Sequence, residues 1–478
     1  MSLDVARPEG HESSAEGAGR AGCEGSRRGF WDWQDRRVAT RWAAGIIAAW
    51  LAVLLVAGLT CEGPLVGDEP HHFCCAQAYY EAGGPIWTYP VATKSGQVRL
   101  YRFNQPYFWH ELLAWVFMLV GGPSFVAAQV YHTAWAALLA VSVWGVATAL
   151  DDSRGELGVW ALLLLFSIPM VTLFSMTFYV DVPLAAALAL SAWLLLRGRY
   201  LWAWVAASVA LLIKLPALLA FPGLILMLWI RERWRILPTV KWGAALCLIL
   251  VAFHVPTALC RRDSPYPYLM VLSAKDVGYW FAERLGLTPP PGSQPPASAP
   301  APGAQAGPRD AMRFIANHPG DLRRPLNWPR FLGVVALPAL AWAAATRKLG
   351  RADLSVALAV AVYWVGFAFL LAPAPDVRYL LSAVTLAAPL GARALAGRGA
   401  WVKAFMLAAA AGTSLATAKV GHDLRTQRPD VLKTMSFLAK HTPPRSVVFM
   451  YPEGDRTLWP REVKWYLPNF QAEAALTA

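Results

Sequence analysis

Residues 42–60 read WAAGIIAAWLAVLLVAGLT, and the triplet GDE follows a few residues later at 67–69. The first stretch contains no charged residue and has about the 20-residue length that a membrane-crossing helix needs. Asp68 and Glu69 therefore lie just beyond a membrane span. Two adjacent carboxylates at a bilayer face are costly unless they are solvated or used in function. Their position indicates a catalytic centre on the far side of a membrane.

The overall composition is that of a polytopic membrane protein. The chain of 478 residues is 56% hydrophobic and 15% charged, whereas soluble domains carry about 25% charged residues. Its mean hydropathy is +0.39, and its 23 Trp fit a protein with two bilayer interfaces. The net charge of +13 does not indicate nucleic-acid binding, because the basic residues fall in short loops between apolar runs. That distribution follows the positive-inside rule and leaves some cations for anionic phosphates.

The N-terminal segment predicts a cytosolic end. Residues 1–41 are rich in Gly, Ser and charge, which is typical of disorder, and no cleavage motif follows the first apolar run. Five arginines crowd the start of that run: Arg27, Arg28, Arg36, Arg37 and Arg41. Further basic loops mark the same side: 197–199, 231–235, 347–351 and 393–403. Spans are then expected near 157–174, 184–196, 200–214, 216–230, 241–260, 331–345, 353–372, 379–392 and 403–419.

The stretch 106–150 must cross the membrane an odd number of times to fit this topology. It holds two apolar runs, 106–120 and 124–150, separated by a Gly-Gly-Pro turn. We expect one run to cross fully and the other to be re-entrant or interfacial. The non-cytosolic side then receives the segments 61–105, 175–183, Lys214, 261–327, 373–378 and 420–478.

The predicted fold is an all-α polytopic membrane protein of about 11 transmembrane helices, with a small α/β C-terminal extramembrane segment. A disordered cytosolic tail (1–41) precedes a transmembrane catalytic domain (42–419) with outer loops 61–105 and 261–327. A small non-cytosolic domain (420–478) follows, with a helix over 428–440 and a short strand near 446–451. The Pro- and Ala-rich residues 289–308 are expected to be a flexible insertion.

The six cysteines do not have the spacing of a zinc site. Cys61 shares an outer loop with Cys74 and Cys75, so a disulfide to either is one interpretation. The other is that these are buried free thiols.

The non-cytosolic segments bring carboxylates and cations to one face. Carboxylates there can act as a general base, and cations can hold a phosphate. Each candidate also has a structural explanation. Asp68 and Glu69 can cap the helix predicted at 70–82, and Asp181 with Pro183 makes a good helix start. Lys214 can extend to an interface, and Arg378 can be a juxtamembrane anchor. His71 and His72 point about 100° apart on a helix and cannot readily share a metal.

The order of these features resembles the GT-C glycosyltransferases, polytopic enzymes that use lipid-linked sugars. The nearest branch includes protein O-mannosyltransferases and the aminoarabinose transferase of lipid A. The matching pieces, in chain order, are GDE at 67–69, NQPY at 104–107, YVDVPL at 179–184, LLIKLP at 211–216, RFIANHP at 313–319 and RYLL at 378–381.

The resemblance implies an inverting transferase with a polyprenyl-phosphate sugar donor and an acceptor hydroxyl on a lipid, glycan or protein. Its site would lie on the periplasmic side of a bacterial inner membrane, within the cell envelope. The catalytic carboxylates would be Asp68, the general base, with Glu69 and Asp181. Cations for the donor phosphate would be Arg378, Lys214 and Arg102. Substrate-positioning residues would be Tyr179, Asn104, Tyr107 and Tyr379. Neither a cofactor nor a metal is expected, because the outer carboxylates lack a third well-spaced acid.

Two other functions fit parts of the pattern. A transporter or flippase for a lipid-linked or anionic solute would place Asp68, Asp181 and Lys214 along its path. Transporters usually show paired halves and sites near the bilayer midplane, whereas these acids gather at one face. A ligase that moves a whole oligosaccharide would use the same residues as the glycosyltransferase.

Overall fold

The computed structural model describes ten segments of the chain, and most of the described residues are helical. The described residues are 32–61, 69–84, 88–92, 98–102, 108–151, 155–260, 350–370, 377–426, 447–450 and 471–474. The insertion 289–308, the loop 261–327, the expected span 331–345 and the expected helix 428–440 lie outside them.

The apolar runs form the helices that their hydropathy predicts, with shifted ends. The α-helices are α1 (Arg36–Leu59), α2 (Glu69–Ala82), α3 (Phe108–Val120), α4 (Phe125–Leu150), α5 (Glu156–Phe166), α6 (Pro169–Met176), α7 (Asp181–Leu196), α8 (Tyr200–Ile213), α9 (Phe221–Arg231), α10 (Ile236–Cys260), α14 (Arg351–Leu370), α15 (Leu381–Leu395) and α16 (Ala400–Thr426). Two 3₁₀ turns, η1 (Leu215–Ala220) and η4 (Val377–Leu380), complete the helical part. The strands are β1 (Thr88–Ala92), β2 (Val98–Arg102), β3 (Val447–Met450) and β4 (Gln471–Ala474).

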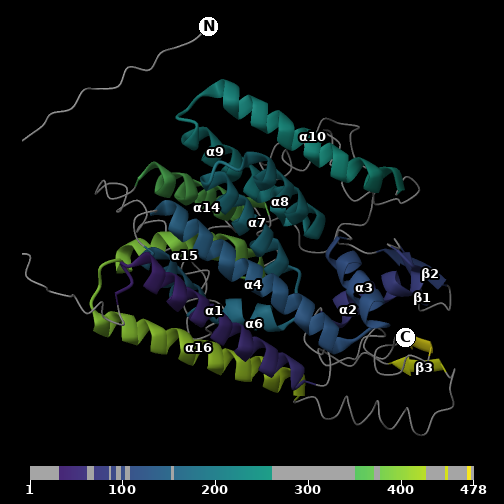
Figure 1. Ribbon diagram of the computed structural model, residues 1–478. Coiled ribbons are helices and arrows are strands. Elements are labelled where there is room, and N and C mark those ends of the chain that lie inside the picture. Colours follow the sequence, from purple (N-terminus) through teal and green to yellow (C-terminus); the bar gives the residue numbers. More distant parts are fainter. Residues whose placement is uncertain are drawn as a thin grey trace, which may run out of the picture.

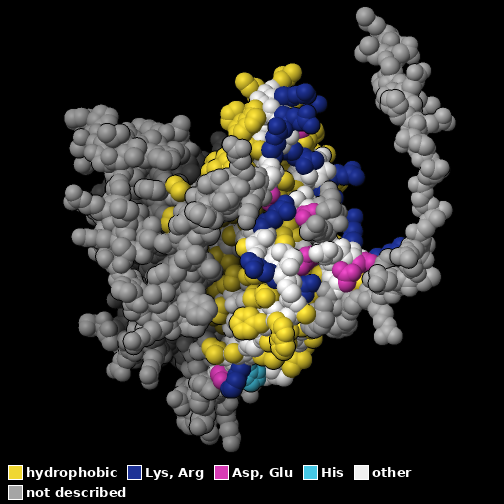
Figure 2. Space-filling model, turned by 90° about the vertical axis from the view of Figure 1, so that its left-hand side faces the viewer, with side chains coloured by type: hydrophobic (Ala, Val, Ile, Leu, Met, Phe, Trp, Pro, Cys, Tyr) yellow, Lys and Arg dark blue, Asp and Glu magenta, His cyan; other side chains and the backbone are white. Residues whose placement is uncertain are grey.

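The long helices lie side by side, and the small elements gather at one end of the bundle. Figure 1 shows α2, α3, β1, β2 and β3 together at its right-hand end. Helices α1 and α16 run in the same direction and both begin at the opposite end. Figure 2 looks onto that opposite end, where Lys and Arg side chains form a band between hydrophobic flanks. This distribution follows the positive-inside rule and agrees with the expected grouping of basic loops.

By length and hydropathy, three helices of the described residues can each cross a membrane. They are α1, α4 and the first 24 residues of α16. Helices α5 and α6 together make a fourth if the pair counts as one bent span. Shorter apolar helices include α3, α7, α8 and α15. The expected total of about 11 spans therefore remains a prediction.

The span expected near 157–174 corresponds to the bent pair of helices α5 and α6. The chain bends by 74° between α5 and α6. Ile168 has extended backbone angles, as is usual for a residue before proline, and Pro169 begins α6. The break leaves the Phe166 carbonyl without its helical partner. The Ser414 hydroxyl of α16 donates a hydrogen bond to it at 3.2 Å, so the last long helix compensates for the break.

The stretch 106–150 forms one long and one short helix. Helix α4 has 26 residues and packs against α1, α5, α7 and α15, whereas α3 has 13 residues and lies beside α2. These lengths agree with the expectation of one full crossing and one interfacial helix. Helix α4 approaches α7 closely at Gly145, where a Cβ atom would lie 2.3 Å from the Trp193 ring.

The end with the small elements holds two short sheets. Strands β1 and β2 pair antiparallel in the loop 61–105, with Thr88 opposite Arg102. Strands β3 and β4 pair in parallel in the C-terminal segment. The expected strand near 446–451 is thus present. Helix α16 continues to Thr426, beyond the span end expected at residue 419, and the separate domain expected over 420–478 stays a prediction.

Candidate functional site

A turn between α6 and α7 organises the polar residues at the end with the small elements. Helix α6 ends at Met176, and Phe178 and Tyr179 lie in the connection to α7. Asp181 is the first residue of α7, where the positive end of the helix dipole favours a carboxylate. Its side chain is 1% exposed. A carboxylate this buried needs a cationic partner.

Lys214 provides that partner. It follows α8 with an extended backbone, since the chain changes direction there before the Leu215–Ala220 3₁₀ turn. Lys214 Nζ donates a hydrogen bond of 2.7 Å to Asp181 Oδ1, and both groups are buried. The sequence placed Lys214 at the phosphate, but in this structure its ammonium group is paired with Asp181.

Arg378 lies on the other side of the same carboxylate. Its Nε atom is 4.0 Å from Asp181 Oδ2, and its guanidinium carbon lies 5.0 Å from the centre of the Tyr179 ring. Within the described residues Asp181 Oδ2 has no hydrogen-bond donor. The Arg378 side chain is 17% exposed, compared with 7% for Lys214. Two cations thus surround one carboxylate, and the more accessible of them is a guanidinium.

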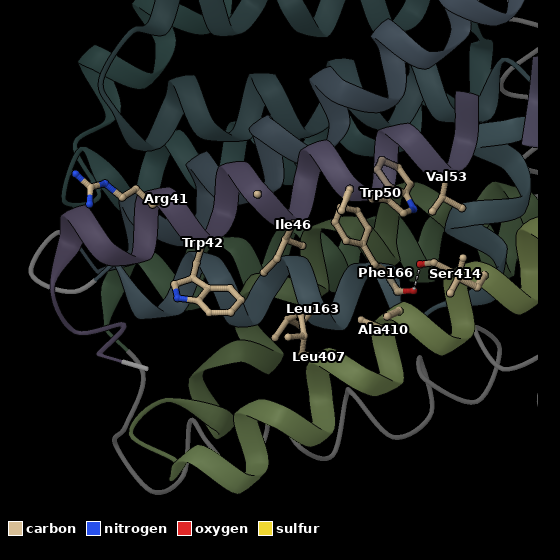
Figure 3. Close-up of a pocket in the computed structure, with 14 residues that line it drawn as sticks. Arg41, Trp42, Ile46, Trp50, Val53, Leu163, Phe166, Leu407, Ala410 and Ser414 are labelled. Atoms are coloured by element: carbon tan, nitrogen blue, oxygen red, sulfur yellow. Dashed lines mark hydrogen bonds between the residues drawn. The ribbon is translucent and has the colours of Figure 1, made fainter. Parts of the chain in front are cut away.

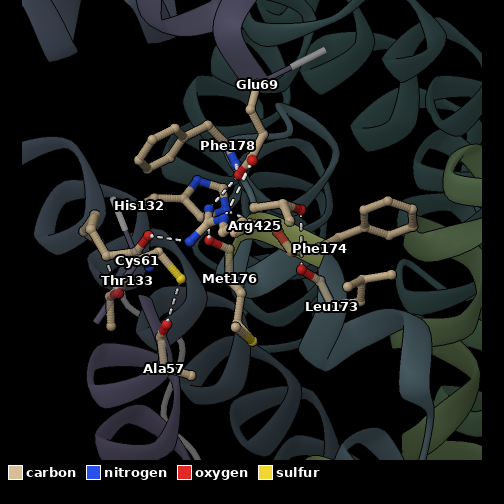
Figure 4. A network of polar contacts seen from close by, with 12 residues as sticks. Ala57, Cys61, Glu69, His132, Thr133, Leu173, Phe174, Met176, Phe178 and Arg425 are labelled. Atoms are coloured by element: carbon tan, nitrogen blue, oxygen red, sulfur yellow. Dashed lines mark hydrogen bonds and ion pairs between the residues drawn. The ribbon is translucent and has the colours of Figure 1, made fainter. Parts of the chain in front are cut away.

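A second buried ion pair contacts Phe178, in the turn that precedes Asp181 (Figure 4). Glu69 at the start of α2 pairs with Arg425 near the end of α16, and both side chains are fully buried. Glu69 Oε1 also accepts a hydrogen bond of 2.9 Å from the backbone N–H of Phe178. Arg425 donates further hydrogen bonds to Gln129 Oε1 at 3.3 Å and to the Met176 carbonyl at 2.6 Å. The hydrogen bonds of this pair therefore connect α2, α4 and α16 to the turn that precedes Asp181.

Two histidines form a third polar contact at the same end. His72 Nδ1 of α2 and His110 Nε2 of α3 are 3.0 Å apart, and both rings are buried. The His72 ring also lies edge-on to Tyr179, with 6.3 Å between ring centres. His110 is therefore a buried histidine with a polar partner inside the bundle.

The structure describes part of the predicted site set. Asp181, Lys214, Arg378 and Tyr179 form one cluster, and Glu69 joins it through Phe178. Asp68, Asn104 and Tyr107 lie outside the described residues. Arg102 and Tyr379 are described at the backbone level, in β2 and η4. Within the described residues, no group of three His, Cys, Asp or Glu side chains is arranged to hold a metal ion.

Arg425 is the residue that the sequence analysis missed. It was assigned to an extramembrane tail because the apolar run was ended at residue 419. A span of 403–419 has 17 residues, fewer than the roughly 20 that a crossing needs. Five other expected spans are shorter still, so this length alone does not show that the helix continues. The pairing itself joins residues 356 positions apart and has no local signature.

Cys61 is a buried free thiol in this structure, as one of the two interpretations predicted, and Cys75 is also buried. The Cys61 thiol donates to the Ala57 carbonyl at 3.0 Å. Burial raises the pKa of the Cys61 thiol, and the nearby Arg425 guanidinium opposes that change. Cys61 is therefore held as a neutral packing group beside the ion pair.

The fold of the chain is similar to the folds of solved membrane proteins. No protein-family model matches the chain, and no curated protein matches its sequence. The fold of the chain is similar to the folds of two proteins of the GT-C superfamily, as the resemblance in its motifs predicted. One similar structure is ArnT, the lipid A aminoarabinose transferase, from Cupriavidus metallidurans bound to undecaprenyl phosphate. It shares 14% identity over 91% of this chain and 86% of its own, with a TM-score of 0.58.

A second similar protein is an oligosaccharyltransferase, AglB from Archaeoglobus fulgidus. Its apo form shares 11% identity over 91% of this chain and 64% of its own, with a TM-score of 0.55. The same protein in complex with an inhibitory peptide and a dolichol-phosphate has a TM-score of 0.54 and 10% identity. At these identities the likeness concerns the fold, that of a polytopic helical membrane protein.

Proposed function

We propose that this chain is a membrane glycosyltransferase that moves a sugar from a polyprenyl-phosphate donor to an acceptor hydroxyl by inverting displacement. The observation that carries the proposal is the buried cluster of Asp181, Lys214 and Arg378 at one end of a GT-C fold. The likeness to ArnT with undecaprenyl phosphate and to AglB with dolichol-phosphate supports a polyprenyl-phosphate ligand.

The charge balance of the cluster suits a lipid phosphate. Lys214 neutralises Asp181 through its 2.7 Å contact, whereas Arg378 is more accessible and 4.0 Å from the same carboxylate. A guanidinium can bind two phosphate oxygens at once, which an ammonium cannot reproduce. The guanidinium carbon of Arg378 lies 5.0 Å from the centre of the Tyr179 ring, a cation–π distance. Arg378 thus binds the donor phosphate, and Asp181 with Lys214 positions Arg378.

In the proposed reaction Asp68 removes the proton from the acceptor hydroxyl. The acceptor oxygen attacks the anomeric carbon from the side opposite the phosphate, and the bond between that carbon and the phosphate oxygen breaks. The electron pair leaves with the polyprenyl phosphate, whose growing charge Arg378 stabilises. Glu69, next to Asp68 in sequence, is held by Arg425 and by the Phe178 N–H. Its role is to position this end of α2.

The site faces the non-cytosolic side of the membrane in this proposal, and a bacterial inner membrane is the expected location. Two features support the orientation. A band of Lys and Arg side chains lies at the opposite end of the bundle (Figure 2), and α2 and α3 lie at the end with the small elements (Figure 1). A lipid, glycan or protein acceptor would approach from the extracytoplasmic side.

The test compares two buried carboxylates at opposite ends of the bundle. Asp181→Asn removes the charge at the proposed site. Asp353→Asn is the matched control, because Asp353 is 1% exposed and pairs with Arg393 at 2.9 Å at the basic end. Purified protein in detergent is assayed for undecaprenyl-phosphate binding and for sugar transfer from a panel of undecaprenyl-phosphate hexoses and pentoses.

Asp181→Asn should lose activity per folded molecule, whereas Asp353→Asn should keep it. Equal activity in the two variants, or wild-type protein that binds no undecaprenyl phosphate, would rule out the proposed site. Movement of the intact lipid-linked sugar across vesicles without transfer would instead identify a flippase.

A further inference from the structure

A groove on the outside of the bundle lies between α1, α5 and α16 (Figure 3). It encloses a cavity of about 600 Å³. Small residues on two helices make the hollow: Gly45 and Ala49 on α1, and Ala410 and Ala411 on α16. A Cβ atom placed on Gly45 would meet no other atom within 4 Å, so this part of the groove is open space.

The body of the groove is apolar, and the polar side-chain atoms of Trp50 and Ser414 already have hydrogen-bond partners. Trp50 stacks on Phe166 with 4.2 Å between ring centres, and its indole N–H donates to Thr172 at 3.2 Å. Ser414 donates to the Phe166 carbonyl at 3.2 Å. The body of the groove therefore offers an occupant dispersion contacts rather than hydrogen bonds, which suits a hydrocarbon chain.

One end of the groove carries a cation. The lining residue Arg41 is exposed, and within the described residues its guanidinium has no hydrogen bond or ion pair. Arg37 lies one helical turn earlier, and neighbouring Trp42 is an amphipathic residue typical of a bilayer interface. From Arg41 to Val53 the lined part of α1 rises by roughly 18 Å, at about 1.5 Å per residue. A single leaflet contributes about 15 Å of hydrocarbon, half of the bilayer core.

We propose that this groove binds one acyl chain of an anionic phospholipid, with the phosphate of its headgroup held by Arg41. The lipid comes from the leaflet at the basic end of the bundle, which the positive-inside rule makes cytosolic. Three observations support this occupant: an exposed cation at the mouth that has no ion pair within the described residues, an apolar lining, and a length of about one leaflet. The site lies on α1, α5 and α16, separate from the Asp181 cluster, and does not depend on the proposed transferase activity.

The experiment uses the purified full-length protein and a phosphatidylglycerol that carries a photoreactive diazirine in its acyl chain. After irradiation, mass spectrometry maps the labelled peptides. Gly45→Phe fills the open space, and Gly412→Phe is the matched control, because Gly412 also borders open space but does not line the groove. Ala49→Leu is a second filling variant in case Gly45→Phe does not fold. The expected result is labelling of α1 and α16 that falls about tenfold in the filling variants and is unchanged in Gly412→Phe.

The headgroup contact has its own comparison. Wild-type protein should be labelled more strongly by the phosphatidylglycerol probe than by a matched phosphatidylethanolamine probe. Arg41→Gln should remove that preference, whereas Arg351→Gln, an exposed arginine at the start of α14, should keep it. Equal labelling of filled and unfilled variants would overturn the proposal. So would competition by undecaprenyl phosphate but not by phosphatidylglycerol, which would assign the groove to the donor lipid.

Discussion

Removing Arg425 should destabilise the whole bundle. Arg425 and Glu69 are both 0% exposed and form a buried ion pair between α16 and α2. Arg425→Met leaves the Glu69 carboxylate buried without its cation and takes donors away from Gln129 Oε1 and the Met176 carbonyl. Breaking a buried pair in this way costs about 3–5 kcal/mol, because the remaining charge must be neutralised or hydrated.

The same helix provides a matched control. Lys419 and Asp423 form an exposed ion pair on α16 at 2.7 Å, with the Lys419 side chain 75% exposed. Like Arg425→Met, Lys419→Met removes one positive charge from α16, but it leaves no buried charge behind. Its free energy of unfolding should equal that of the wild type within measurement error.

The assay is reversible unfolding in mixed micelles, followed by tryptophan fluorescence, for the wild type, Lys419→Met, the single variants Arg425→Met and Glu69→Gln, and the double variant Glu69→Gln/Arg425→Met. The double variant removes both charges, so it should lose less stability than the two single changes added together. If Arg425→Met unfolds at the same denaturant concentration as Lys419→Met, the pair does not hold the helices together. The positioning role proposed for Glu69 would then also be lost.

Three further predictions concern other parts of the chain. Arg378→Ala should weaken use of the polyprenyl-phosphate donor by about ten- to a hundred-fold, since a charge-assisted hydrogen bond is worth roughly 1.5–3 kcal/mol. Arg378→Lys should lose less activity, and normal turnover of folded Arg378→Ala would contradict the phosphate role. Deleting 289–308 should leave transfer activity close to wild type, because a run rich in Pro, Ala and Gly has little side-chain surface to bury; loss of folded protein on size-exclusion chromatography would refute this. Gly145→Leu should lower the melting temperature in detergent, because a Cβ atom at this position would lie 2.3 Å from the Trp193 ring. An unchanged melting temperature would show that α4 and α7 can move apart without loss of stability.

The positions of the helices and of the basic end of the bundle could be predicted because both depend on local signals in the sequence. Runs of apolar residues marked the helices, and clusters of arginine marked one end of the bundle. The helix expected at 70–82 is α2, and Asp181 begins a helix as Pro183 two residues later suggested. The signal for the break at Pro169 was present, but a proline inside an apolar run is also compatible with a kinked continuous span.

The pairings within the site could not be read from the sequence. Asp181 and Lys214 are 33 residues apart, and their contact depends on the reversal between α7 and α8. The partner of Glu69 is 356 residues away, on a helix whose last turn had been assigned to the tail. Which cation meets which carboxylate depends on how the helices pack, and local composition does not encode that.

Helix α16 has a consequence for how the protein is made. Ser414 completes the broken span at Phe166, and Arg425 neutralises Glu69, so groups near the start of the chain depend on residues near its end. At 5–20 residues per second, about 20–70 s of translation separate Glu69 from Arg425. During that time the nascent bundle holds a buried acid without its cation and a membrane carbonyl without its donor. Ribosome pausing or loss of α16 would leave that intermediate exposed to the quality-control proteases of the membrane.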